Sequence, residues 1–241
     1  MNIAIIFAGG TGQRITSSTL PKQFMEHRNK PILVYTLEKF QAHEKIDGII
    51  VVMLEAWIGH TENLVQNYGL TKVKAIIPGG ETGQESIYYG VKKAAAMFPE
   101  DSIVLIHDGV RPLIDAGTIT RALACAKEKG SAITTAPAIE TITLSDAEGK
   151  VGEIIDRSRC QMARAPQCFR LGELFTAHQK ARADNKNDFI DSASLMRYYG
   201  YPLYSIEGPA ENIKITTPID YAMFCAIVDT QTGKEKNEHR V

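Results

Sequence analysis

The segment NIAIIFAGGTGQR (residues 2–14) decides how the rest of the chain is interpreted. Its first part, residues 3–7, is almost entirely apolar, which is typical of a strand buried on both faces of a sheet. Glycines follow closely, and glycine-rich turns bring backbone N–H groups against an anion. Ligands bind at the carboxyl ends of strands in open α/β sheets. The segment therefore predicts a first strand that ends in an anion-binding loop.

Two common glycine-rich loops do not match this segment. The Rossmann fingerprint of dinucleotide-binding proteins needs a third glycine where this chain has Ile15. The P-loop needs Lys followed by Ser or Thr after its last glycine, and neither residue follows Gly12. A redox dehydrogenase is therefore disfavoured.

Strands and helices alternate along most of the chain. This alternation predicts a three-layer, doubly wound α/β fold with a mostly parallel sheet and helices on both faces. The strands are expected at 3–7, 48–54, 73–77, 102–108, 203–207 and 212–216. Helices are expected at 31–43, 56–67, 84–98, 116–129, 171–183 and 191–199, with a last helix that begins at the Thr217-Pro218-Ile219-Asp220 cap.

The alternation stops at a segment that we call the arm, residues 138–164. Apolar and polar residues alternate there around a turn at 146–149, which indicates an extended hairpin. A hairpin of this kind is not stable alone, so it is expected to pack on a partner subunit or, alternatively, on its own sheet. We expect one domain over residues 1–232 that includes the arm, and a polar tail over 233–241.

Composition and charge exclude several functional classes. The chain has 241 residues and a formal net charge of −1, which argues against nucleic-acid binding. No stretch approaches 18 apolar residues, and the first residues resemble no signal peptide. Its four cysteines show no metal-binding spacing, as in reduced cytoplasmic proteins. These features predict a cytoplasmic protein that acts on a small molecule and contacts no membrane.

Two cations flank the glycine-rich loop. Arg14 lies within it, and Lys22 follows in the stretch Leu20-Pro21-Lys22-Gln23. A triphosphate would suit this pair, because phosphoryl transfer spreads negative charge over several oxygens. Taken alone, two loop cations are as well explained by exposure to solvent.

A family resemblance favours the functional interpretation. AGGTGQR followed by LPKQF resembles the signature of the nucleotide-sugar pyrophosphorylase superfamily, and its PKQ is typical of the cytidylyltransferase branch that makes CDP-methylerythritol or CDP-ribitol. The resemblance covers nearly the whole chain and continues in order through Gly79-Gly80, Ser86, His107-Asp108-Gly109-Val110-Arg111-Pro112, Asp156-Arg157, Ala165-Pro166-Gln167, Asp191-Ser192-Ala193-Ser194 and Asn212-Ile213-Lys214-Ile215-Thr216.

The resemblance implies a reaction and a set of roles. Such an enzyme transfers CMP from CTP to the phosphate of a sugar alcohol, and the acceptor phosphate is already an ionised nucleophile that needs no general base. The catalytic cations implied are Arg14, Lys22 and Lys214. The nucleotide-binding residues implied are Ala8, Gly9, Gly10, Thr11, Gly12, Gly80, Ser86 and Gly109.

Metal and acceptor sites are implied in the same way. Asp108, at the end of a predicted strand, would lie beside Mg²⁺ on the phosphates, although it also suits a turn. The acceptor-binding residues implied are Arg111, Thr141, Arg157 and Asp191. In the family the arm residues reach across from the other subunit of a homodimer. Arg159 and Arg164 are alternatives, but as cations of an exposed arm we expect them to be solvated.

The chain departs from the family at Gly83, where an arginine is common. The identity of the acceptor is also undecided between two molecules. Residues 30–40 and 57–61 resemble enzymes for ribitol 5-phosphate, but 162–167 lacks the Gln-Gly-Gln-Thr-Pro-Gln run of those enzymes. We favour ribitol 5-phosphate, with 2-C-methyl-D-erythritol 4-phosphate as the alternative. Other hypotheses are a nucleotidyltransferase with another base or with a sugar 1-phosphate, and an inactive nucleotide-binding regulator.

Overall fold

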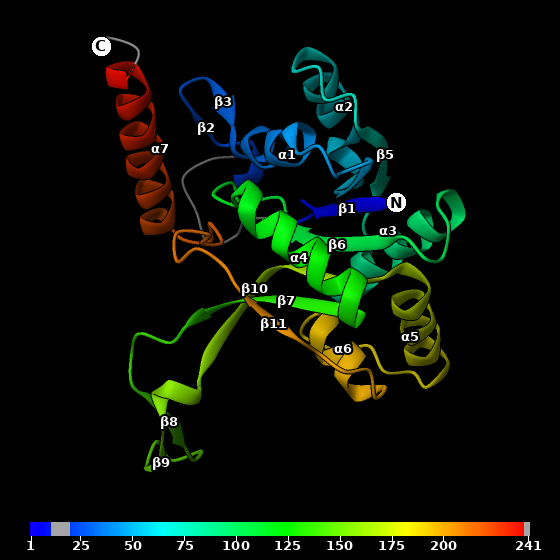
Figure 1. The fold of residues 1–241 in the computed structure, drawn as a ribbon, viewed down its shortest axis with the longest axis vertical. Helices are drawn as coiled ribbons and strands as arrows, with labels where there is room; N and C mark the ends of the chain where they lie inside the picture. Colours follow the sequence, from blue (N-terminus) through cyan, green and yellow to red (C-terminus); the bar gives the residue numbers. More distant parts are fainter. Residues whose placement is uncertain (11–19, 239–241) are drawn as a thin grey trace.

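In the computed structural model, which describes residues 1–10 and 20–238, seven strands form one central sheet (Figure 1). Its order is β11-β7-β10-β6-β1-β4-β5. The β1 strand pairs in parallel with β4 and β6, β4 with β5, and β7 with β11. The strands are β1 (Asn2–Phe7), β4 (Gly48–Met53), β5 (Val73–Pro78), β6 (Ile103–Asp108), β7 (Ser131–Pro137), β10 (Gln161–Arg170) and β11 (Ser205–Glu207).

Helices cover both faces of this sheet. Along β1, Ala4 and Ile6 join one buried cluster while Ile3 and Ile5 join the other, as the twofold period of a strand requires. One face carries α1 (Ile32–Ala42), α2 (Ile58–Asn67) and α4 (Ala116–Lys129), and the other carries α3 (Gly83–Met97), α5 (Leu171–Ala183) and α6 (Ser192–Tyr198). The predicted three-layer α/β fold is confirmed.

The β10 strand was not predicted. It runs antiparallel to both β6 and β7 in the middle of the sheet, and its first residues were assigned to the arm instead. The register of β10 against β7 shifts between Ala163 and Gln167, so the strand carries an irregularity where it leaves the sheet toward the arm. A strand that begins in the exposed arm and ends in the buried core shows no single hydrophobic period along its length.

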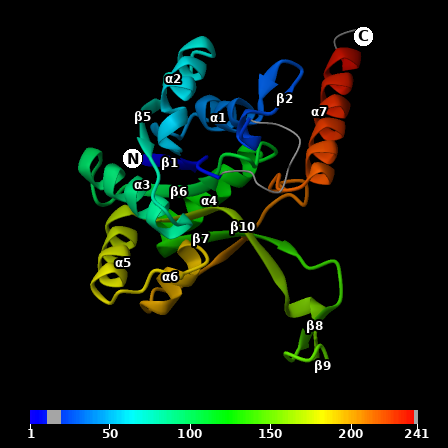
Figure 2. The same ribbon diagram turned by 180° about the vertical axis from the view of Figure 1, so that it is seen from behind.

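The arm extends away from the body of the molecule rather than covering the sheet, as Figure 2 shows from behind. Its hairpin consists of β8 (Ile142–Ser145) and β9 (Val151–Ile155), followed by the short 3-10 helix η3 (Arg157–Arg159). Apolar side chains of the arm are exposed in this chain: Ile139, Leu144, Val151, Ile154 and Met162.

One expectation near the end of the chain, the strand at 212–216, is wrong. Residues 212–216 form an irregular segment rather than a strand, held by a bond from Ile215 N–H to the Val110 carbonyl. The helix α7 (Pro218–Glu238) continues through most of the predicted tail. Its start is fixed by Asp220, whose carboxylate accepts from the backbone N–H groups of Thr216 and Thr217.

Short elements connect the loop after β1 to α1 and α7. They are the 3-10 helix η1 (Lys22–Phe24) and the hairpin strands β2 (Glu26–His27) and β3 (Lys30–Pro31), with a second 3-10 helix, η2 (Glu55–Trp57), after β4. The α7 helix binds this hairpin through Tyr221, whose hydroxyl donates to the Glu26 carbonyl, and through Asp229, which pairs with His27 and Arg28. In the part of the chain that the structure describes, no helix combines the length and apolar character needed to cross a bilayer.

Candidate active site

A cavity of about 570 Å³ opens at the carboxyl ends of β1, β5 and β6. Ten of the predicted residues line it: Ala8, Gly9, Gly10, Lys22, Gly80, Ser86, Asp108, Arg111, Asp191 and Lys214. The predicted residues Thr11, Gly12 and Arg14 lie outside the described residues. Gly109 packs behind the cavity wall, where its N–H donates to the Phe7 carbonyl at 2.7 Å. Thr141 and Arg157 lie on the arm.

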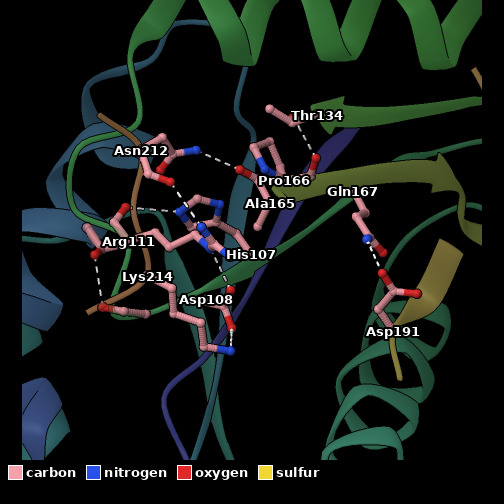
Figure 3. Close-up of polar contacts among 12 residues, drawn as sticks. His107, Asp108, Arg111, Thr134, Ala165, Pro166, Gln167, Asp191, Asn212 and Lys214 are labelled. Carbon is pink, nitrogen blue, oxygen red and sulfur yellow. Dashed lines mark hydrogen bonds and ion pairs between the residues drawn. The ribbon is translucent and has the colours of Figure 1, made fainter. Parts of the chain in front are cut away.

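Asp108, the last residue of β6, is the centre of a charged cluster (Figure 3). Its Oδ1 lies 2.7 Å from Lys214 Nζ, and its Oδ2 lies 2.8 Å from Arg111 Nε. Burial raises the pKa of Asp108, but the two cations outweigh burial and bring it down to about 2. The carboxylate is therefore ionised at neutral pH, and it holds two cations that both line the cavity.

The cluster is tied to two further segments. Arg111 Nη1 donates to the Asn212 carbonyl at 3.0 Å, and the Asn212 side chain donates to the Ala165 carbonyl at 2.7 Å. His107 Nε2 lies 3.2 Å from the Arg111 carbonyl, and burial lowers the pKa of His107 to about 4. The neutral imidazole thus donates to this carbonyl without adding charge. His107 and Asn212 lie in the quoted motifs, but their sequence context alone assigns them no role.

Lys22 enters the cavity from η1, which is fixed to the end of β1. The buried Gln23 side chain donates to the Ala8 carbonyl at 2.5 Å. The Lys22 stem runs beside Gly10: a Cβ placed on Gly10 would lie 3.8 Å from Lys22 Cε. Lys22 and Lys214, far apart in sequence, therefore line one cavity.

The turn after β5 is held by its own helix. Ser86 Oγ accepts from Gly80 N–H and donates to the Thr82 carbonyl, both at 3.0 Å, while Glu85 accepts from Glu81 N–H at 2.9 Å. A Cβ on Gly80 would collide with the Glu85 side chain, which would then have to move from its place beside the turn. The hydroxyl of Ser86 thus shapes the turn that lines the cavity, in addition to the nucleotide contact predicted for it.

Asp191 also has a structural role. It caps α6 by accepting from Ser194 N–H at 2.8 Å, and its other oxygen accepts from the Gln167 amide at 2.7 Å. Gln167 is buried on β10 and accepts in turn from Ala193 N–H at 2.9 Å. Since both residues line the cavity, this pair fixes the part of its wall that β10 and the start of α6 form.

The two arm residues lie apart from this cavity. Arg157 donates to the Ile139 carbonyl at 2.9 Å and lines a second hollow of about 680 Å³ on the arm, and Thr141 is exposed beside β8. Within one chain the predicted acceptor residues are thus divided between two places.

Arg164 differs from its expected position. It was expected among solvated arm cations, yet it is half-buried on β10 and lines the main cavity, whereas Arg159 is exposed on η3. The shift in register next to it lies where β10 turns from the arm into the sheet.

The residues present fit a magnesium ion that is bound mainly by substrate. Mg²⁺ in nucleotide sites takes one or two carboxylates and completes its shell with phosphates and water. Asp108 supplies such a carboxylate in the cavity, where its two oxygens also contact Arg111 and Lys214. Among the side chains that the structure describes, no group of three or more His, Cys, Asp or Glu residues suited to a metal occurs.

Gly83, at the first position of α3, leaves room for the arginine that is common in the family. No atom lies within 4 Å of a Cβ built there.

We expect Gly83→Arg to fold normally, with a melting temperature within about 3 °C of the wild type. Removing the flexibility of glycine stabilises the fold, whereas a cation at the start of a helix opposes the helix dipole, so the two effects offset each other. We expect the added cation beside the cavity to lower the KM for CTP about two- to fivefold at low salt. Gly59→Arg, at another open helical site, is the control; an equal KM shift in both variants would count against a local effect.

Comparisons with known proteins agree with this geometry. Residues 2–230 match the model of the family described as IspD: 2-C-methyl-D-erythritol 4-phosphate cytidylyltransferase. A ribitol-5-phosphate cytidylyltransferase of Vibrio parahaemolyticus is 51% identical over 231 residues, which cover 96% of this chain and 97% of that protein. A 2-C-methyl-D-erythritol 4-phosphate cytidylyltransferase of Clostridium botulinum is 36% identical over 96% of this chain and 99% of its own.

Solved structures show the same fold. The 4-diphosphocytidyl-2C-methyl-D-erythritol synthase of Anaerococcus prevotii superposes with a TM-score of 0.81 over 95% of this chain and 96% of its own, at 23% identity. The 2-C-methyl-D-erythritol 4-phosphate cytidylyltransferase of Francisella tularensis superposes with a TM-score of 0.75 at 29% identity, over 93% of this chain and 99% of its own.

Proposed function

Because the chain belongs to the IspD family of cytidylyltransferases, we propose that it transfers CMP from CTP to the phosphate of D-ribitol 5-phosphate, releasing pyrophosphate. The observation that carries the reaction is one cavity that gathers Gly9, Gly10, Lys22, Asp108 and Lys214 at the carboxyl edge of the sheet. The choice of acceptor is supported by the 51% identity to a ribitol-5-phosphate enzyme, against 36% to a methylerythritol-phosphate enzyme.

The residues of the cavity act by positioning and by neutralising charge. The acceptor phosphate is an ionised nucleophile at neutral pH, so catalysis needs oriented cations rather than a general base. Lys22 and Lys214 line the cavity from two segments and stabilise negative charge on the reacting phosphates. Arg111, fixed by Asp108 and by the Asn212 carbonyl, binds the acceptor.

The proposal includes Mg²⁺ as the cofactor. Asp108 would hold the ion together with the nucleotide phosphates, and the bound ion would supply positive charge that neutralises those phosphates. The pKa of Asp108, lowered to about 2, keeps this carboxylate ionised at neutral pH.

Pyrophosphate release with CTP tests the reaction and the acceptor together. Ribitol 5-phosphate and 2-C-methyl-D-erythritol 4-phosphate are supplied in separate reactions, each with Mg²⁺ and again with excess EDTA. We expect turnover with ribitol 5-phosphate that EDTA abolishes. Turnover with the other acceptor alone would reassign the substrate, and no turnover with either, with CTP still bound, would support an inactive regulator.

We also propose that the enzyme is a homodimer joined through the arm. The arm exposes apolar side chains such as Ile139 and Ile154, at 74% and 68%, and Arg157 lies on it outside the main cavity. Packing the arm of one subunit beside the cavity of the other would bury these side chains and bring Arg157 to the acceptor.

Mixing two inactive variants tests a shared site. Lys22→Ala and Arg157→Ala each abolish every site in their own dimers, but a mixed dimer has one site with both residues intact. After joint unfolding and refolding at equal amounts, half of the dimers are mixed, so we expect about a quarter of the wild-type activity to return. If the mixture stays as inactive as its parents, Arg157 does not act across the interface.

A further inference from the structure

We propose that Arg164 binds the phosphate of the acceptor and helps to select a phosphorylated acceptor. Arg164 would act on the nucleotide cavity of its own subunit. This inference rests on the proposed function. Arg164 was expected to be a solvated residue of the arm, but its side chain is half-buried and lines the main cavity.

The surroundings of Arg164 leave part of its guanidinium for a ligand. Toward the residues that the structure describes, its hydrogen bonds run from Nη1 to the carbonyls of Ala210 at 2.6 Å and Pro209 at 3.3 Å. An arginine has five N–H donors in a planar fork, so Nε and Nη2 remain for an anion. The backbone carbonyls fix the side chain without neutralising its charge.

The charges of the cavity favour an anion beside Arg164. Burial and the nearby Arg111 cation lower the pKa of Arg164, and the Glu211 carboxylate opposes this only in part. Two guanidinium groups repel each other in a partly buried site, and an anion that contacts both removes this repulsion. The carboxylate of Asp108 is already paired with Lys214 and Arg111, and that of Asp191 accepts from Gln167 and Ser194.

The position of Arg164 favours the acceptor over CTP. Three residues before it on β10, Gln161 lines the hollow on the arm that contains Arg157, while Arg164 lines the cavity that contains Lys22 and Asp108. The strand therefore leads from the arm into the cavity. Arg164 also lines the cavity near Arg111, the residue that the proposed function assigns to the acceptor.

Substitution of Arg164 tests the proposal. For Arg164→Gln we expect the KM for the acceptor to rise about 10- to 100-fold, since a hydrogen bond to a charged group is lost. The KM for CTP should stay within about twofold, because the proposed contact is to the acceptor alone. Arg164→Lys keeps the charge but not the planar fork of donors, so its KM for the acceptor should lie between the values of the wild type and of Arg164→Gln. Arg159→Gln removes an exposed arm cation that lines neither hollow and serves as the matched control.

A purely structural role predicts a different pattern. Arg164 holds the segment that leads to Lys214, so misplacing this segment would lower kcat and raise the KM for CTP along with that for the acceptor. That pattern, or an unchanged acceptor KM in Arg164→Gln, would overturn the proposal. If Arg164→Gln failed to fold, Arg164→Lys would decide by the same comparison of the two KM values.

Binding separates this inference from the proposed function. If the wild-type enzyme turned over neither polyol phosphate, the proposed function would fail on its own. Calorimetric titration of inorganic phosphate into the wild type and into Arg164→Gln would still decide on Arg164. We expect weaker binding in the variant, and equal affinity would overturn the proposal.

Discussion

Lys22→Ala is expected to lose about 10²- to 10³-fold in kcat while the fold remains intact, because it removes a cation that faces developing charge in the transition state. Lys22 lines the cavity from η1, and its stem runs beside Gly10 of the glycine-rich loop. Its neighbour Gln23 anchors η1 to β1 through the Ala8 carbonyl. Truncating Lys22 therefore removes charge from the site and leaves the anchor in place.

Steady-state kinetics and thermal unfolding of the same preparations measure this result. Lys22→Arg keeps the charge but changes its shape and should recover part of the lost turnover. Lys39→Ala, an exposed lysine on the last turn of α1, controls for the loss of a surface cation. Turnover of Lys22→Ala within about threefold of the wild type would remove Lys22 from the catalytic set. An equal loss in Lys39→Ala would point to a general effect of charge.

The first half of the fold could be predicted because each of its strands has one environment. The apolar run at 3–7 and the GIIVVM strand β4 are buried on both faces, so composition alone identifies them as central strands. The Gly9-Gly10 turn after β1 and the Asp108 terminus of β6 then meet at one edge because parallel strands share a direction. The cavity follows from this arrangement.

The second half could not be predicted in the same way, since single segments there serve two environments. The β10 strand begins in the exposed arm and ends in the core, so its sequence follows no single pattern of polar and apolar residues. That pattern therefore does not indicate that Arg164 lines the cavity. Residues 212–216 have the composition of a strand, but the Asn212 and Lys214 side chains bond to the Ala165 carbonyl and to Asp108, and the segment forms no backbone ladder with a neighbouring strand. Long-range contacts of this kind leave no local period in a sequence.

Lys214→Met is expected to lower kcat about 10²- to 10³-fold and to change how the enzyme responds to acid. Lys214 Nζ lies 2.7 Å from Asp108 Oδ1 and lines the cavity from the segment before α7. Its side chain is 44% exposed, so the ion pair itself should contribute at most about 1 kcal/mol to the free energy of unfolding. A large loss of activity with a small loss of stability is therefore the expected combination.

The acid response follows from the pKa of Asp108. Burial raises this pKa and the two cations lower it, from 3.8 to about 2. Because the folded value is below the ordinary one, the ion pairs stabilise the fold fully above about pH 4 and lose this contribution as the pH falls toward 2. Without Lys214, burial is opposed by Arg111 alone, so the folded pKa of Asp108 rises toward its unfolded value and the variant has less stability to lose in acid.

Thermal unfolding of the wild type and of Lys214→Met between pH 7 and pH 3 measures this shift, with exposed Lys45→Met as the matched control. The difference in melting temperature between wild type and Lys214→Met should narrow as the pH falls from about 5 to 3, because protonation of Asp108 removes an ion pair that only the wild type has. Lys45→Met should follow the wild type. Lys214→Arg should retain the wild-type acid response and part of the turnover, because the cation still reaches Asp108. A constant difference across this range would show that Lys214 does not control the ionisation of Asp108. A kcat within about threefold of the wild type would separately show that Lys214 does not act on the reacting phosphates.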